Sequence, residues 1–161
     1  MFETILDSLT ARGIRFVVIG GVAATVHGSA RFTNDIDLCY DTAPDSVESL
    51  IQLLIEWRAY LRGVEPGLPF ILDMRTFRTT PMLTLTTTMG AIDLLDEVPG
   101  VGNYAKAFAA SEVALVGATE FRVLTLEALI ASKKAVRRKR DIEHLVELEA
   151  LLALRRRNGP R

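Results

Sequence analysis

The chain has 161 residues, of which 49% are hydrophobic, and a formal net charge of −1. These values favour one folded domain with a buried core and argue against global disorder. Cys39 is the only cysteine, which excludes a disulfide framework and a thiolate metal cluster. No apolar run approaches the ~20 residues that a membrane-spanning helix needs, and the first residues lack the basic start of a signal peptide. We therefore expect a cytoplasmic protein without a membrane partner.

Charge is distributed unevenly along the chain. Residues 1–120 carry 8 Lys and Arg against 15 Asp and Glu, whereas residues 121–161 carry 11 against 5. Six cations lie close together: Lys133, Lys134, Arg137, Arg138, Lys139 and Arg140. This basic cluster predicts a polyanionic partner such as RNA. The alternative is a solvated helix face that pairs with the acidic part of the chain.

The first elements surround a glycine pair. Residues 4–12 have helical apolar spacing, and Phe16–Ile19 is an apolar, β-branched run typical of a buried strand. The strand ends at Gly20 and Gly21, and a short helix is expected over residues 22–26. Two glycines at such a turn allow backbone N–H groups to approach a ligand at the positive end of the helix dipole. The turn therefore predicts a phosphate site.

The next strand, expected over residues 36–40, opens with Asp35-Ile36-Asp37. Because side chains alternate along a strand, Asp35 and Asp37 point to the same face. Two neighbouring carboxylates repel each other unless a cation lies between them. Oxygen ligands of this kind suit Mg²⁺ or Mn²⁺ that carries the phosphates of a nucleotide.

Together these residues carry a family resemblance. Gly20-Gly21, 13 further residues and Asp35-x-Asp37 resemble the signature of the nucleotidyltransferase superfamily that includes DNA polymerase β. The longer string GGVAATVHGSARFTNDIDL resembles the bacterial AbiEii-type nucleotidyltransferases, which are the toxins of some toxin–antitoxin pairs. The resemblance implies nucleotide contacts from the glycines, and the positions of Arg31 and Thr33 before the aspartates suggest contacts to the triphosphate. A haloacid dehalogenase is disfavoured because no Gly-Thr follows the aspartates.

The middle of the chain is less regular. Asp45 is a suitable N-cap for a helix over residues 45–61, in which Trp57 and Tyr60 are expected to pack. Residues 65–81 predict a loop with short strands. Residues 82–88 and 91–95 predict a β-hairpin around Gly90.

Asp93 lies among apolar residues of the second hairpin strand. A carboxylate in that setting is costly unless it is paired or bound to metal. Residues 87–95 match a family string, T..G.iDLL, and the resemblance implies that Asp93 is the third metal ligand. It would also accept a proton from the attacking hydroxyl. Asp96 and Glu97 are expected to be solvated.

The remaining elements follow in order. Residues 97–104 predict a loop that borders the nucleotide pocket, followed by a helix over residues 105–110 and strands over residues 112–116 and 121–124. His27 is expected to pack at a helix end, because no second histidine lies at metal-ligand spacing and His144 is distant in sequence.

Two helices close the chain. Thr125 is expected to cap the first and Asp141 the second, in which the apolar stripe would comprise Ile142, Leu145, Val146 and Leu152. The segment LIASKKAVRRKRDIEHLVEL also resembles a block of the AbiEii-type family. That resemblance implies catalytic or nucleotide-binding roles for Lys133 and Asp141. The chain departs from the family at Arg140, where a lysine is usual.

We therefore predict an α/β nucleotidyltransferase fold, with a small mixed β-sheet, flanking helices and a C-terminal helical part. Residues 1–161 would form one domain, with an α/β catalytic core over residues 1–120 and C-terminal helices over residues 121–161. The expected reaction is metal-dependent transfer of a nucleoside monophosphate from an NTP to tRNA or another RNA, with an antitoxin as a further partner. Alternatives are a protein-modifying (AMPylating) enzyme and a non-catalytic nucleotide-binding protein of the same fold.

Overall fold

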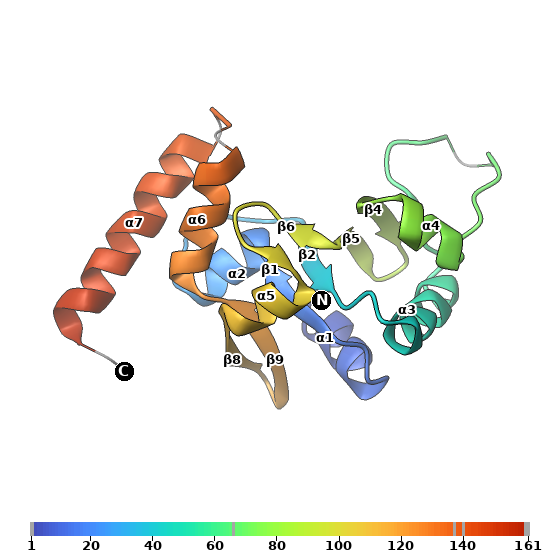
Figure 1. Ribbon diagram of the computed structural model, residues 1–161, viewed down its shortest axis with the longest axis horizontal. Coiled ribbons are helices and arrows are strands. Elements are labelled where there is room, and N and C mark those ends of the chain that lie inside the picture. Colours follow the sequence, from blue (N-terminus) through green and yellow to red (C-terminus); the bar gives the residue numbers. More distant parts are fainter. Residues whose placement is uncertain (1, 66, 137, 140, 160–161) are drawn as a thin grey trace.

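A seven-stranded mixed sheet forms the centre of the fold (Figure 1). The computed structural model describes residues 2–65, 67–136, 138–139 and 141–159. The strands lie in the order β3 (Tyr60–Leu61), β4 (Met82–Thr87), β5 (Gly90–Leu95), β2 (Asp35–Tyr40), β1 (Phe16–Ile19), β9 (Thr119–Leu124) and β8 (Ser111–Val116). The sheet confirms the predicted mixed α/β fold class.

The order of the strands brings together segments that are distant in sequence. β2 pairs antiparallel with β1 and parallel with β5, so that the chain returns to the centre of the sheet after a long connection. β4 and β5 form the predicted hairpin, and β8 and β9 form a second one at the opposite side. Since β9 also pairs with β1, the predicted division at residue 121 falls inside a strand of the sheet.

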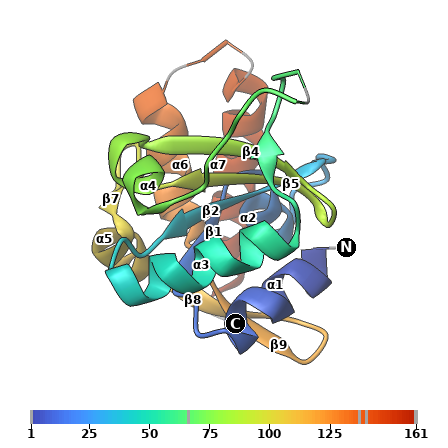
Figure 2. The same cartoon turned by 90° about the vertical axis from the view of Figure 1, so that its right-hand side faces the viewer.

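Helices flank the sheet (Figures 1 and 2). They are α1 (Phe2–Ala11), α2 (Gly20–Val26), α3 (Pro44–Glu56), α4 (Met74–Thr79), α5 (Tyr104–Ala109), α6 (Leu126–Val136) and α7 (Asp141–Asn158). α6 and α7 lie side by side at one end of the molecule, and α3 and α4 lie at the other. The short strands β6 (Glu97–Val98) and β7 (Gly102–Asn103) pair outside the main sheet. None of the helices in the described ranges is long and apolar enough to cross a membrane.

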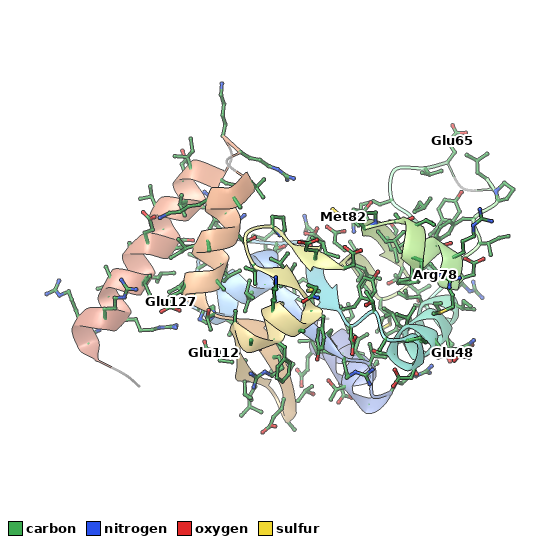
Figure 3. All side chains as sticks on the ribbon, viewed as in Figure 1. Glu48, Glu65, Arg78, Met82, Glu112 and Glu127 are labelled. Atoms are coloured by element: carbon green, nitrogen blue, oxygen red, sulfur yellow. The ribbon has the colours of Figure 1, made fainter. Side chains whose placement is uncertain are left out.

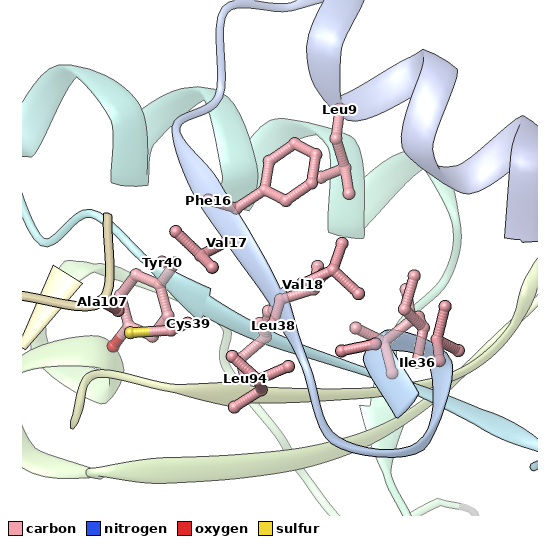
Figure 4. Packing of buried hydrophobic residues seen from close by; sticks show 14 of the residues in the cluster. Leu9, Phe16, Val17, Val18, Ile36, Leu38, Cys39, Tyr40, Leu94 and Ala107 are labelled. Atoms are coloured by element: carbon pink, nitrogen blue, oxygen red, sulfur yellow. The ribbon is translucent and has the colours of Figure 1, made fainter. Parts of the chain in front are cut away.

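The core lies between the sheet and these helices. Leu9 of α1 lies against Phe16 of β1, and both are buried (Figure 4). β1 is a continuous buried apolar run, and β2 is fully buried from Leu38 to Tyr40, as expected where both faces of the sheet are covered. Burial of so much apolar surface is the main force that holds the central strands in place.

The structure corrects the prediction for residues 45–81. α3 ends at Glu56 rather than near residue 61, and Arg58 has a positive φ of 53° that turns the chain into β3. Trp57 is buried as predicted, and the ring of Tyr60 packs edge-on against that of Phe70, with 5.9 Å between the ring centroids. The Tyr60 hydroxyl lies within hydrogen-bond distance of the carbonyls of Glu65 and Leu68. Among the described residues from 65 to 81, the structure has the helix α4 in place of the expected short strands.

The C-terminal helices are present, but the predicted apolar stripe of α7 is only partly correct, since Leu145 and Leu152 are partly buried against the core and its other two members are not. Ile142 and Val146 are 60% and 63% exposed, and the buried residues of α7 are His144 and Leu148. Side chains of α7 project away from α6 into solvent (Figure 3).

The capping role of Thr125 is confirmed, since its hydroxyl accepts a hydrogen bond from the Ala128 N–H. Within the basic cluster, Arg137 and Arg140 lie outside the described residues.

Candidate active site

Three carboxylates converge on one face of the sheet. Asp35 and Asp37 come from β2, and the parallel register places Asp93 of β5 directly beside Asp37. One oxygen of each carboxylate lies within 4.8 Å of the other two. The alternation of side chains along β2 explains why both of its aspartates face the same way. Asp35, Asp37 and Asp93 are called the carboxylate cluster below.

The electrostatics of the carboxylate cluster are unfavourable without a cation. Burial, and then the charges of Asp93 and Asp35, raise the pKa of Asp37 to about 8. Burial also raises the pKa of Asp93. Within the described residues, Oδ1 of Asp37 is buried and has no hydrogen-bond partner. An all-oxygen cluster with an unpaired buried oxygen has the chemistry that a hard divalent cation prefers.

The glycine turn lies against this cluster. Helix α2 begins at Gly20 itself, two residues earlier than predicted, and Gly20 has a positive φ of 65°. A Cβ atom at Gly20 would lie 2.0 Å from Oδ2 of Asp37, and one at Gly21 would lie 3.0 Å from the Thr33 side chain. Gly20 is therefore required both by its backbone conformation and by the proximity of Asp37.

Lys133 and Asp141 form an ion pair across the gap between α6 and α7. The Nζ atom of Lys133 lies 2.8 Å from Oδ1 of Asp141. Both residues line a cavity of about 370 Å³ together with the carboxylate cluster and Gly20. Residues predicted from three separate motifs thus meet in one cavity, which also includes Val98 and Pro99 of the loop expected to border the pocket.

Arg31 and Thr33 lie beside the cavity but do not line it. The hydroxyl of Thr33 donates to the backbone carbonyl and to Oδ1 of Asp35, at 3.0 and 3.2 Å. The guanidinium of Arg31 lies 3.7 Å from the carboxylate of Glu143 on α7. Thr33 thus orients one member of the carboxylate cluster, and Arg31 connects the loop before β2 to α7.

Arg62, which follows β3 directly, also reaches the carboxylate cluster and was not among the predicted site residues. Its Nη2 lies 2.7 Å from Oδ1 of Asp93, and its Nη1 lies 3.7 Å from Oδ2 of Asp35. No local pattern marks this residue, because it reaches the carboxylate cluster only through the pairing of β3 with β4 and of β4 with β5.

The two histidines are structural within the described residues. His27 is buried at the end of α2, as predicted, with Nε2 2.8 Å from the Leu124 carbonyl and Nδ1 3.1 Å from Arg155 of α7. His144 is buried on α7, and burial followed by the charges of Lys133 and Arg31 lowers its pKa. Its Nε2 lies 3.8 Å from the carboxylate of Glu147, one turn further along α7.

A mixed sheet that presents three clustered carboxylates beside a glycine turn defines a nucleotidyltransferase-type fold. A family model described as nucleotidyl transferase AbiEii toxin, type IV TA system, matches residues 4–142. The chain therefore belongs to the AbiEii family of nucleotidyltransferase toxins, which confirms the resemblance seen in the sequence. A comparison with curated proteins gives no match.

Proposed function

We propose that the protein transfers a nucleoside monophosphate from an NTP to a hydroxyl of tRNA or another RNA, as the toxin of a toxin–antitoxin pair. The observation that carries this proposal is the convergence of the carboxylate cluster, Gly20 and the Lys133–Asp141 pair on one cavity. These groups come from four separate parts of the chain. Packing alone does not explain the position of any of the three aspartates.

The carboxylate cluster would hold Mg²⁺ or Mn²⁺. The bound cation would neutralise charge on the transferring phosphoryl group and on the leaving pyrophosphate. The residues fit such an ion because all three ligands offer oxygen and because Oδ1 of Asp37 has no other partner among the described residues. A cation would also relieve the repulsion that raises the pKa of Asp37.

The other residues would bind and orient the substrates. Gly20 lines the cavity beside the carboxylate cluster, where the triphosphate would lie, and Gly21 would contribute its backbone N–H from the first turn of α2. Lys133 would exchange Asp141 for a phosphate oxygen, and Arg31 would move from Glu143 to the triphosphate. Thr33 would keep Asp35 in its orientation through the hydrogen bonds described above.

Asp93 would act at the acceptor side. It lies on β5, farther from the glycine turn than β2 in the strand order. Its carboxylate would accept the proton of the attacking hydroxyl, since it would lie beside the acceptor. Asp141 would hold Lys133 in position until the nucleotide arrives.

The basic cluster supports RNA as the acceptor. Arg138 and Lys139 are exposed between α6 and α7, and Arg138 lines the same cavity as the carboxylate cluster. Exposed cations at the mouth of a phosphoryl-transfer site are suited to a nucleic-acid backbone. A protein hydroxyl is the second candidate acceptor. A cytoplasmic location and a cognate antitoxin belong to the same proposal.

The test is incubation of the protein with each of the four α-labelled NTPs, Mg²⁺ and total RNA, followed by separation of RNA from protein. We expect label in RNA, and we expect Asp35→Asn, Asp37→Asn and Asp93→Asn each to reduce it by at least ~100-fold. Label in protein alone would favour the AMPylating alternative. Nucleotide binding without transfer would favour the non-catalytic one.

A further inference from the structure

Among the described residues, Arg62 is the cation that forms ion pairs with the carboxylate cluster. Its guanidinium spans Asp93 and Asp35, at 2.7 and 3.7 Å. The side chain is 34% exposed, so it reaches the cluster from the solvent side rather than from within the core. A positive group therefore already lies where two of the three carboxylates converge.

The contacts of Arg62 are those of a replaceable cation. The Nη2 atom donates a hydrogen bond to the Leu85 carbonyl at 2.9 Å, which anchors the guanidinium to β4. Each carboxylate is reached by a single nitrogen of the guanidinium, Asp93 by Nη2 at 2.7 Å and Asp35 by Nη1 at 3.7 Å. Nε of Arg62 is buried without a hydrogen-bond partner among the described residues. The pair is thus electrostatic and lacks the bidentate geometry that makes an arginine–carboxylate pair strong.

The strand order places Arg62 on a definite side of the site. Arg62 follows β3 at one edge of the sheet, whereas Gly20 follows β1 on the other side of β5 and β2. Lys133 belongs to α6, which packs against α2 and therefore lies on the side of the glycine turn. Arg62 thus approaches the cluster from the side opposite to the glycine turn.

We propose that Arg62 is a positioning residue that takes the place of the metal ion in the metal-free protein and is displaced when the metal binds. The inference rests on the proposed function, because it takes the carboxylate cluster to be the metal site. A divalent ion held by all three carboxylates would compete with the guanidinium for the oxygens of Asp93 and Asp35, and its compact double charge favours the ion. In the metal-free protein, Arg62 would thereby reduce the repulsion among the three carboxylates and lower their affinity for metal.

The alternative is a purely structural role, in which Arg62 connects β3 to β4 through its bond to Leu85. The two roles differ in their dependence on metal. A structural contact contributes equally with and without metal, whereas a competing cation stabilises only the metal-free protein.

The test is calorimetric titration with Mn²⁺ alone, near pH 8 and at low salt, for the full chain and three variants. Arg62→Met keeps an apolar stem and removes the charge. Arg62→Lys keeps the charge but lacks the planar guanidinium that can reach two carboxylates at once. Arg75→Met is the matched control, because Arg75 is an exposed arginine of α4 that lies outside the cavity. We expect Arg62→Met to bind Mn²⁺ about five- to tenfold more tightly than the parent. Arg62→Lys should fall between them, and Arg75→Met should stay within about twofold of the parent.

Thermal unfolding supplies a second readout. Without metal, Arg62→Met should melt below the parent, and saturating Mn²⁺ should remove most of that difference. Equal or weaker Mn²⁺ binding by Arg62→Met, or a melting deficit that metal leaves unchanged, would overturn the inference. If Arg62→Met does not fold, Arg62→Lys replaces it in the test. The inference is then overturned if Arg62→Lys binds Mn²⁺ no more tightly than the parent. A parent chain that binds no Mn²⁺ would refute the metal centre itself, whereas a parent that binds Mn²⁺ and transfers nucleotide would leave the proposed function intact.

Discussion

Asp37→Asn should stabilise the metal-free protein at alkaline pH. Asparagine keeps the shape of the side chain and removes one of three charges whose oxygens lie within 4.8 Å of one another. Catalysis would be lost in this variant, but the fold would gain. This combination of effects distinguishes a ligand cluster from carboxylates that stabilise the fold.

The magnitude follows from the geometry. Two unit charges 4.8 Å apart repel by about 3.5 kcal/mol at an effective dielectric constant of ~20. Asp35 is only partly buried, and Arg62 offsets part of the negative charge, so relief of charge repulsion contributes about 2 kcal/mol. Relief of the burial of a charged carboxylate, which is the main cause of the raised pKa of Asp37, adds to this gain. For a chain of this size, about 2 kcal/mol corresponds to an increase in melting temperature of roughly 4–8 °C, which is the lower bound that we expect.

The gain should depend on pH in a defined direction. An unfolded aspartate loses its proton near pH 4, whereas the pKa of folded Asp37 is raised to about 8. Between these values the folded parent holds a proton that the unfolded chain has lost, so its free energy of unfolding falls as pH rises. Asparagine does not titrate. The advantage of the variant should therefore grow from about pH 4 and level off above about pH 8.

The assay is urea or thermal unfolding of both proteins in EDTA, followed by circular dichroism, at pH 5 and pH 8.5. Glu48→Gln is the control, because Glu48 is an exposed carboxylate of α3 (Figure 3) that does not line the cavity. A variant that is no more stable than the parent at pH 8.5, or an advantage of equal size at both pH values, would refute the reasoning. Saturating Mg²⁺ should reverse the order, because only the parent keeps all three ligands.

Two further predictions concern the glycine turn and the basic cluster. Gly20→Ala should lower the free energy of unfolding by about 2 kcal/mol or more and weaken Mn²⁺ binding, since its Cβ would lie 2.0 Å from Oδ2 of Asp37; unfolding curves and calorimetry measure the two effects. Reversal of charge at Arg138 and Lys139 should weaken RNA binding and make it less dependent on salt. The slope of log K against log[salt] should fall in magnitude by about 0.7–0.9 for each phosphate that the variant no longer neutralises. Filter binding at several salt concentrations measures both effects.

Each of these two predictions has a matched control. Gly13 also has a positive φ, of 69°, but a Cβ there would meet nothing within 4 Å, so Gly13→Ala measures the backbone strain alone. Reversal of charge at Arg156 and Arg157, at the far end of α7, should leave the salt dependence close to that of the parent. Effects of equal size in a variant and its control would contradict the corresponding prediction.

The sequence by itself determined the centre of the sheet and the three candidate ligands. Phe16–Ile19 and the hairpin around Gly90 are apolar or alternating runs whose structure is set by nearby residues. Asp35 and Asp37 share a face because of the period of a strand, which local sequence reveals directly. The spacing from the glycine pair to these aspartates was specific enough to indicate the family that the family model confirms.

Only the tertiary structure decided the remaining features. Residues 60 and 61 form a strand because β4 offers them a partner, although their apolar spacing continues that of α3. Ile142 and Val146 have helical spacing, yet nothing in the described structure covers them, since periodicity cannot show which face of a helix finds a neighbour. Arg62 reaches the carboxylate cluster across two strand pairings, and such long-range contacts depend on the register of the whole sheet rather than on any local pattern.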